Sequence, residues 1–470
     1  MLYYYNREFD RKQEIGLTKS GNMTQGAEWK HILLFALPIM AGNALQQLYN
    51  TVDGIVVGNF VSDTALGAVG ACAPLTMVFI ALAIGMSNGS AVVVGQYYGA
   101  NKPEEMRRTV STSMILLLIM GVVLSVVGVI VARPMLSGLM KVSGPYLEYA
   151  VEYFTIYAMG LIFQFAYNIF SAILRALGDS KATLYFLLIS SVVNTVLDLV
   201  FVVWFRWDVK GAAIATVISQ AASAVCAFVY MRSKYELLRF KKGEFRFHKA
   251  SALLTMKIAI PSTMTQAVVS CGSLAIQRII NDFGAIYPGL MSGATAGSRL
   301  ESFVMIPIFG FNTAQVAFAS QNVGAGKLDR VVRGRNAGLV MGLICCSVIS
   351  LATYLLREPL ISLFGVNADG MYYGALHIAI LCPCMLIFCL MMTTSGIMHG
   401  AGDAKFGAFM TLSSFIVRVL FAYIFAYTSS MEYLAVWVAI PVGWTYNLIL
   451  CWARYYSGAW KKKGIAHAKT

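Results

Sequence analysis

The chain has 470 residues, of which 58% are hydrophobic and only 12% are charged, and its formal net charge is +14. Soluble domains carry about 25% charged residues, so this composition excludes a cytosolic enzyme, a coiled coil and a disordered protein. The basic excess would suit nucleic acid, but its placement along the chain indicates a membrane topology instead.

Twelve apolar stretches follow one another along the chain. Each is long enough to cross about 30 Å of hydrocarbon as a helix, which takes about 20 residues. The runs are continuous rather than alternating, which favours helices over barrel strands. In chain order they cover residues 31–52, 64–101, 109–132, 153–174, 182–205, 211–231, 258–277, 302–326, 336–356, 370–402, 406–431 and 433–453. We therefore predict an all-α polytopic membrane protein with twelve transmembrane helices.

The basic residues lie mostly on one side of this arrangement. Threading the spans from a cytoplasmic N-terminus places 28 of the 36 Lys and Arg on the inner side, as the positive-inside rule requires. The first 30 residues are polar and show no cleavable signal peptide. We expect a multi-pass protein of the cell membrane with both termini in the cytoplasm, embedded in the lipid bilayer and binding no nucleic acid.

The second half of the chain repeats the first at an offset of about 224 residues. The segment ILRALGDSK, ending at Lys181, matches IMHGAGDAK, ending at Lys405, and GQYYGANK around Gln96 matches SQNVGAGK around Gln321. Six spans per repeat is an even number, so both halves enter the membrane from the same side, as in one class of transporter repeats. The predicted domains are a cytoplasmic segment (1–29), an N-lobe (30–232), a linker (233–250), a C-lobe (251–457) and a basic tail (458–470).

Carboxylates inside the membrane are the strongest indication of a functional site. Asp53 ends the first span, and Asp198 lies inside the fifth, one helical turn after Asn194 on the same face. Thr216 lies in the following helix. These hard oxygen ligands can hold a small cation such as Na⁺ or share a proton, so we predict an ion-coupling site. The alternatives are that Asp53 caps a helix end or borders the lipid headgroups, and that Asp198 only hydrogen-bonds a neighbour.

The C-terminal half lacks this carboxylate pair. The repeat places Arg418 over Asn194 and Ala422 over Asp198, so coupling is expected in one lobe only. Arg418 is interpreted either as a partner of Glu301 or as a side chain that reaches the lipid headgroups. Arg299 and Glu301 are expected to form a self-compensating pair near the outer start of the eighth span.

Other polar groups give no sign of an enzyme. The sequence has no HExxH pattern and no serine–lysine pair at helical spacing, His377 and His399 stand alone, and the segment ending at Lys327 is not a phosphate loop. The nine cysteines all lie in apolar stretches and are interpreted as small buried hydrophobic residues. We therefore expect no enzymatic activity, no disulfide and no cofactor.

Several of these motifs resemble one known family. The resemblance is carried by the stretch LPIMAGNALQQLYNTVDGIVVGNF, the motif RALGDSK with its repeat GAGDAK, the stretch GQYYGANK and the NxxxD pattern of the fifth span. These segments are similar to the multidrug and toxic compound extrusion (MATE) family, and most similar to its MepA-like bacterial branch. The resemblance covers the chain except for about 25 N-terminal residues.

The resemblance implies a two-lobed exporter that rocks between outward and inward states and exchanges Na⁺ or H⁺ for a drug-like, often cationic, small molecule. It places the coupling site at Asp53, Asn194, Asp198 and Thr216. Gln46, Tyr49 and Asn168 would then line the substrate cavity of the N-lobe; their alternative role is hydrogen bonding between helices.

The predicted function is secondary active multidrug efflux by a monomer, with H⁺ or Na⁺ as the coupling ion. The alternative is a flippase of the same superfamily for a lipid-linked oligosaccharide or peptidoglycan precursor. Such a flippase is expected to have more than twelve spans and a cationic central cavity. The predicted carboxylate pair therefore favours multidrug efflux over the flippase.

Overall fold

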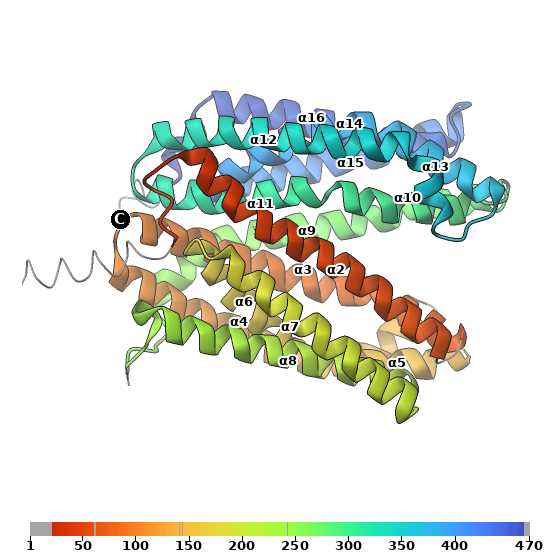
Figure 1. The fold of residues 1–470 in the computed structure, drawn as a ribbon, viewed down its shortest axis with the longest axis horizontal. Coiled ribbons are helices and arrows are strands. Elements are labelled where there is room, and N and C mark those ends of the chain that lie inside the picture. Colours follow the sequence, from red (N-terminus) through yellow and green to blue (C-terminus); the bar gives the residue numbers. More distant parts are fainter. Residues whose placement is uncertain (1–20, 61–62, 141, 143, 242, 465–470) are drawn as a thin grey trace, which may run out of the picture. The chain divides into compact units, whose positions relative to one another are not determined.

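The computed structural model describes residues 21–60, 63–140, 142, 144–241 and 243–464. Within these ranges the side chains of 49–60, 63–67, 139, 145, 270–271 and 273–275 are not described. The regular structure of the described residues is helical throughout (Figure 1).

The helices follow the predicted spans closely. The first half contains α2 (Glu28–Phe60), α3 (Asp63–Gly99), α4 (Pro103–Pro134), the π-helical η1 (Met135–Leu139), α5 (Pro145–Met159), α6 (Leu161–Ala176), α7 (Ser180–Asp198), the π-helical η2 (Leu199–Trp204) and α8 (Asp208–Lys234). The second half contains the 3₁₀ turn η3 (Glu236–Leu238), α9 (Lys249–Gly284), α10 (Leu290–Val304), α11 (Ile306–Gly324), α12 (Leu328–Leu355), α13 (Arg357–Ser362), α14 (Ala368–Gly400), α15 (Ala404–Thr428), α16 (Leu434–Tyr456) and the 3₁₀ turn η4 (Ala459–Lys462).

Ten of the described helices are long and apolar enough to cross a membrane, and two bent pairs raise the number of candidate spans to twelve. This confirms the predicted all-α polytopic fold. The first bent pair is α5 with α6, at an angle of 47°, and the second is α10 with α11, at 41°. The second break falls beside Pro307, which cannot donate a backbone hydrogen bond to the preceding turn.

The eighth span begins earlier than the sequence indicated. The apolar run starts at residue 302 because Arg299 and Glu301 interrupt it, but α10 begins at Leu290. Both charged residues therefore lie well inside a helix instead of at its outer start. No ion pair joins them among the described residues, and Glu301 contacts His377 instead. The prediction that Arg299 and Glu301 form a self-compensating pair is therefore wrong.

Packing divides the chain into two compact units. Of the described residues, those of 21–24 and 41–263 form unit 1, and those of 25–40 and 264–464 form unit 2. The divisions fall within α2 and α9, so each of these long helices contributes to both units. The lobe boundaries at residues 232 and 251 stay a prediction.

Corresponding helices in the two halves end at matching positions. Helix α3 ends at Gly99 and α11 ends at Gly324, and α7 begins at Ser180 where α15 begins at Ala404. These offsets of 225 and 224 residues confirm the internal repeat. The repeated motifs thus mark the same helix ends in each half.

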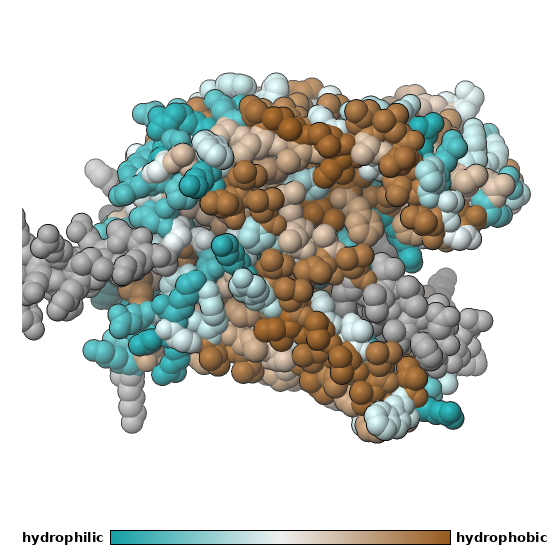
Figure 2. All heavy atoms as spheres, viewed as in Figure 1, coloured by the Kyte–Doolittle hydropathy of each residue, from teal (hydrophilic) through white to brown (hydrophobic). Residues whose placement is uncertain are grey.

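Apolar side chains remain exposed on the helices. On α12 they form a stripe with helical spacing, at Val340, Ile344, Val348, Leu351 and Leu355, each more than half exposed. On the face shown in Figure 2, hydrophobic residues cover the middle of the helices and hydrophilic residues gather near the helix ends. Exposed apolar surface of this kind fits contact with lipid chains rather than with water.

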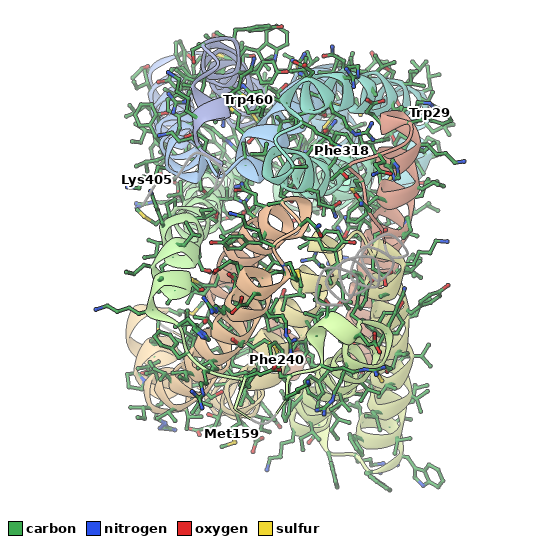
Figure 3. All side chains as sticks on the ribbon, turned by 90° about the vertical axis from the view of Figure 1, so that its left-hand side faces the viewer. Trp29, Met159, Phe240, Phe318, Lys405 and Trp460 are labelled. Atoms are coloured by element: carbon green, nitrogen blue, oxygen red, sulfur yellow. The ribbon has the colours of Figure 1, made fainter. Side chains whose placement is uncertain are left out.

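The segment that follows α8 is held against α4 of unit 1. The Arg107 guanidinium donates to the carbonyl oxygen of Arg239 at 2.9 Å and forms an ion pair with Glu244. It also lies 5.6 Å from the ring centre of Phe240, which is labelled in Figure 3. The predicted linker is therefore a docked segment of unit 1 over this stretch.

Candidate functional site

Helix α7 carries the two polar residues that the sequence singled out in the fifth span. The Asn194 and Asp198 side chains are each 1% exposed. They lie one turn apart, so both side chains project from one face of the helix. The α-helical geometry ends at Asp198, and the next six residues are π-helical. Short π-helical stretches inside helices frequently occur at functional sites.

Helix α8 places Thr216 next to this face. The Asn194 Nδ2 atom lies 3.5 Å from Thr216 Oγ1, and the hydroxyl donates to the carbonyl oxygen of Ala212 at 3.0 Å. The structure thus brings Asn194 and Thr216 together across two neighbouring helices, with Asp198 on the same face of α7. Their role in ion coupling stays a prediction.

The predicted residues of the first span are only partly described. Asp53 and Tyr49 lie in α2, but their side chains are outside the described part of the structure. Gln46 is on the same helix, and its side chain is exposed. The predicted pairing of Asp53 with Asp198 therefore stays a prediction, as does the Na⁺ position at Asp53, Asn194, Asp198 and Thr216.

Asn168 lies in α6 and is half-buried. Its amide donates to the carbonyl oxygen of Gln164, four residues earlier, at 2.9 Å. This bond is within its own helix, and neither a cavity-lining role nor a bond between helices follows from it. Asn168 as a substrate-cavity residue stays a prediction.

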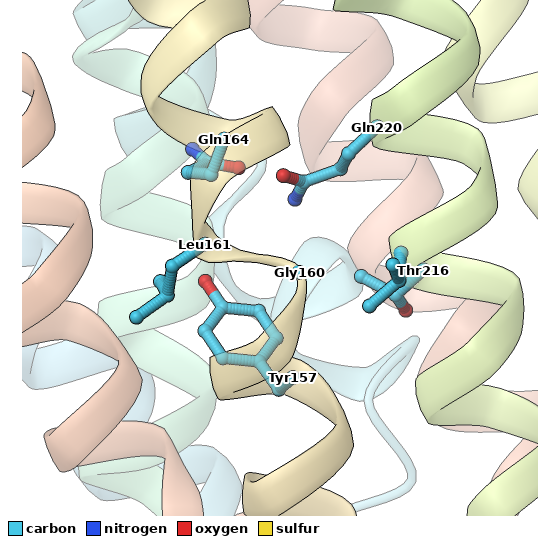
Figure 4. A pocket seen from close by; sticks show the side chains of 7 residues that line it. Tyr157, Gly160, Leu161, Gln164, Thr216 and Gln220 are labelled. Atoms are coloured by element: carbon cyan, nitrogen blue, oxygen red, sulfur yellow. The ribbon is translucent and has the colours of Figure 1, made fainter. Parts of the chain in front are cut away.

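A narrow pocket opens beside Thr216, at the break between α5 and α6 (Figure 4). Gln164 and Gln220 point toward one another across it, and Tyr157 lies below the break. The Tyr157 hydroxyl is buried and makes no hydrogen bond within the described chain. The break at Gly160 is tightly packed, because a Cβ atom there would lie 2.4 Å from Val217 Cγ2. The pocket thus lies between Thr216 on α8 and the broken span, a neighbourhood that the sequence did not indicate.

Asp179 is the centre of a polar cluster at the start of α7. It caps the helix by accepting from the backbone N–H of Ala182 at 3.2 Å, and it also accepts from Lys234 at 2.7 Å, Tyr230 at 2.9 Å and Tyr235 at 3.0 Å. Burial by itself would raise the pKa of the Asp179 carboxyl. The hydrogen bonds from Lys234 and Tyr230 and the charge of Lys234 outweigh burial and hold the pKa below its ordinary value of 3.8.

The repeat places an equivalent ion pair at the start of α15. Arg454 Nε donates to Asp403 Oδ2 at 2.8 Å, and Arg454 Nη2 donates to Asp403 Oδ1 at 3.2 Å. Asp403 is 4% exposed. Both halves therefore tie the start of one helix to the end of the next by an acid–base pair, which explains the repeated GD motif as a structural feature rather than a coupling site.

Unit 2 contains a buried histidine that lies beside a carboxylate. His377 on α14 is 2% exposed, and its Nε2 lies 3.3 Å from Glu301 Oε2 on α10. The imidazole stacks on the Trp437 ring, with centroids 5.2 Å apart. His377 and Glu301 are 76 positions apart in the chain, so no sequence spacing could have paired them; only the packing of α10 on α14 does.

Among the described residues, no group of three or more His, Cys, Asp and Glu side chains is arranged as a metal site. The cysteines Cys72, Cys346, Cys389 and Cys451 are free and buried. They pack as small apolar residues, as the sequence predicted for them.

Comparisons with known proteins agree with this architecture. The chain is 28% identical over 449 residues to the probable multidrug resistance protein YoeA of Bacillus subtilis (strain 168), which covers 93% of this chain and 95% of that protein. It is 21% identical to the multidrug export protein MepA of Staphylococcus haemolyticus (strain JCSC1435), over 84% of this chain and 86% of MepA. A solved structure of a multidrug resistance MATE family transporter in an outward-facing conformation superposes with a TM-score of 0.88 at 24% identity, covering 94% of this chain and 99% of that one.

The likeness to the solved structure establishes the fold, and the family is established by a separate match. The MatE family model matches the chain twice, over residues 38–200 and 261–424. The two matched segments correspond to the two repeats and together cover more than half of the sequence. The chain therefore belongs to the MatE family, whose members are multi-pass membrane transporters.

Proposed function

We propose that this protein is a secondary active efflux transporter that exports amphipathic, often cationic, small molecules in exchange for H⁺ or Na⁺. The names of its relatives support export, since YoeA is a probable multidrug resistance protein and MepA a multidrug export protein. The residues of unit 1 support coupling to an ion.

The observation that carries the proposal is the burial of Asp198 within a membrane span. An ionised aspartate at the centre of a membrane helix costs about 2.5–3.5 kcal/mol even on the lenient insertion scale. Asp198 is 1% exposed, and Asn194 and Thr216 place further oxygen atoms on the same side of α7. Carboxylate, amide and hydroxyl oxygens suit a hard cation, and a carboxylate in this setting also takes up a proton readily.

The coupling of ion entry to substrate export follows from the charge of the site around Asp198. In the outward state, H⁺ or Na⁺ binds at Asp198 together with Asp53, Asn194 and Thr216, which neutralises the site and lowers its affinity for a cationic substrate. Rocking to the inward state then releases the ion to the cytoplasm and restores the anionic site. An ion can shift this equilibrium only through its different affinities for the two states. Ion and substrate must therefore compete.

The test is transport in proteoliposomes with a pH gradient and a sodium gradient imposed separately, and with ethidium as the substrate. We expect Asp198→Asn to lower gradient-driven transport at least tenfold, because the amide removes the charge that the coupling ion neutralises. The matched control is Asp208→Asn, the same change at an exposed residue at the start of α8, which should transport as the parent does.

Two results would count against the proposal. Full gradient-driven transport by Asp198→Asn would remove the coupling role of this residue. Ethidium transport that followed neither gradient would remove antiport altogether.

A further inference from the structure

Unit 2 gathers three tyrosines from segments that are far apart in the chain. Tyr287 lies in the connection between α9 and α10, Tyr373 lies in the second turn of α14, and Tyr433 directly precedes α16. The ring centre of Tyr433 lies 5.0 Å from that of Tyr287 and 5.3 Å from that of Tyr373. The centres of Tyr287 and Tyr373 are 6.5 Å apart. In the predicted topology these segments share the outer side of the membrane, so the rings meet at the outer end of unit 2.

The rings stand nearly at right angles to one another. The interplanar angles are 66° between Tyr287 and Tyr433, 68° between Tyr287 and Tyr373, and 86° between Tyr373 and Tyr433. Tyr372, which is 61% exposed, adds a fourth ring at 74° to Tyr373. These four rings form the tyrosine cluster. The other three are only half-buried, so part of each ring stays accessible. The face of an aromatic ring carries partial negative charge and attracts cations.

Two carboxylates accompany the tyrosine cluster. Glu432 accepts a hydrogen bond from the Tyr287 hydroxyl, and this bond raises the pKa of Tyr287 to about 12. A phenol that donates to a carboxylate also carries more electron density on its ring, which strengthens the attraction of that ring for a cation. Asp369 lies on α14 one turn before Tyr373 and is exposed. Neither carboxylate forms an ion pair within the described chain.

The backbone holds this arrangement in place. Glu432 has a φ of 48°, a left-handed conformation that is uncommon for residues other than glycine. Gly289, two residues after Tyr287, has a φ of 83°, and a Cβ atom there would lie 2.6 Å from the backbone nitrogen of Gly370. The connection that carries Tyr287 therefore packs directly on the start of α14, which carries Tyr373. Rings fixed in this way lose little freedom when a ligand binds.

An ordinary role in the membrane does not explain the cluster. Tyrosine is common where membrane helices meet the lipid headgroups, but that role needs neither rings that pack on one another nor a carboxylate that binds a phenol. The cluster continues inward to Trp437, which is 2% exposed and whose ring centre lies 5.6 Å from that of Tyr433. Ring faces beside unpaired carboxylates are the groups that recognise an organic ammonium ion.

We propose that the tyrosine cluster, with Glu432 and Asp369, binds the quaternary or tertiary ammonium group of an organic cation at the outer end of unit 2. All of these residues belong to unit 2, so the site is separate from Asp198 in unit 1. The inference rests on the proposed efflux function for its role, in which an exported cation binds here as it leaves. A quaternary ammonium group donates no N–H hydrogen bond, so ring faces and negative charge recognise it.

The test uses two small molecules that differ in charge but hardly in shape. Choline carries a trimethylammonium group, and in 3,3-dimethylbutanol a carbon atom replaces the nitrogen. Binding of radiolabelled choline to the purified full-length protein is measured by equilibrium dialysis, with 3,3-dimethylbutanol as the competitor. We expect the neutral analogue to compete at least about fivefold more weakly than unlabelled choline, because it lacks the charge that the rings attract.

Substitutions separate the ring from the hydroxyl. Tyr433→Leu and Tyr373→Leu should each weaken choline binding about fivefold or more, whereas Tyr433→Phe and Tyr373→Phe should change it less than about twofold, because the ring face remains. Glu432→Gln should also weaken binding, since its amide oxygen still accepts from Tyr287 but the charge is lost. This conservative change decides the matter if the leucine variants do not fold.

The matched control is Tyr185→Leu, the same change at a 56% exposed residue of α7 in unit 1, which should leave choline binding unchanged. Equal competition by 3,3-dimethylbutanol would overturn the inference, because the rings would then offer only apolar contact. Unchanged choline binding in the leucine variants and in Glu432→Gln would overturn it as well.

Transport separates this outcome from failure of the proposed function. Choline binding needs no gradient, and its dependence on the tyrosines should be the same in Asp198→Asn as in the parent. If ethidium transport follows an ion gradient and requires Asp198 while choline binding ignores the tyrosines, only the outer site is wrong. If tyrosine-dependent choline binding persists while ethidium follows neither gradient, the site stands and the proposed efflux function is wrong.

Discussion

Adding one methyl group at Gly89 should drive two helices of unit 1 apart. Helices α3 and α9 approach so closely that a Cβ atom at Gly89 would lie 2.4 Å from Ala259 Cα, and one at Gly85 would lie 2.4 Å from Thr263 Cα. The small-xxx-small spacing of these two glycines is typical of closely packed membrane helices. The obstructing atoms are backbone, so a change of rotamer cannot relieve the clash.

The magnitude follows from the geometry. Ordinary van der Waals contact begins near 3.4 Å, so Gly89→Ala requires the helices to move apart by about 1 Å, which forfeits packing contacts along their interface. Overpacking of this kind costs about 1–3 kcal/mol. The matched control is Gly70→Ala in the same helix, where an added Cβ atom meets nothing within 4 Å. There alanine should stabilise the helix by about 0.5–1 kcal/mol.

The two variants should therefore shift the melting temperature in opposite directions. Thermal unfolding in detergent can be followed with a thiol-reactive dye, because Cys72, Cys346 and Cys451 are fully buried in the folded protein. We expect the melting temperature of Gly89→Ala to fall below that of the parent and that of Gly70→Ala to equal or exceed it. A Gly89→Ala protein as stable as Gly70→Ala would show that the contact of α3 with α9 is looser than described.

Two further predictions concern the repeated ion pairs. Asp403→Asn leaves Arg454 without its two charged hydrogen bonds and should lower the free energy of unfolding by about 2–4 kcal/mol. The control, Asp329→Asn, changes an exposed residue of α12 and should lower the free energy of unfolding by less than about 1 kcal/mol. Equal melting temperatures of the two variants in the thiol assay would contradict this prediction. The pKa of Asp179 is depressed by its partners, so its stabilising effect is complete at neutral pH and is lost as the pH falls below 3.8. The stability difference between the parent and Asp179→Asn should therefore be constant from neutral pH to about pH 5 and shrink below that, and a difference that shrank already between pH 7 and pH 5 would refute the assignment.

Sequence alone predicted much of the fold because the membrane imposes strong local rules. A helix of about 20 apolar residues satisfies its own backbone in lipid, so hydropathy located the twelve candidate spans without any tertiary information. The same periodicity placed Asn194 and Asp198 on one face of α7, and the repeat predicted that Asp179 and Asp403 occupy equivalent helix starts. These features depend on neighbours along the chain.

The bends and the charged group of unit 2 depend instead on neighbours in space. Arg299 and Glu301 interrupt the apolar run, so hydropathy did not show the first half of the eighth span. Helix α10 nevertheless continues through both residues, and the Glu301 carboxylate lies 3.3 Å from His377 Nε2. His377 stands alone in the sequence, and only the packing of α14 on α10 brings it to Glu301. Hydropathy measures each residue against lipid, whereas the cost of a buried charge depends on the partner that only the folded chain supplies.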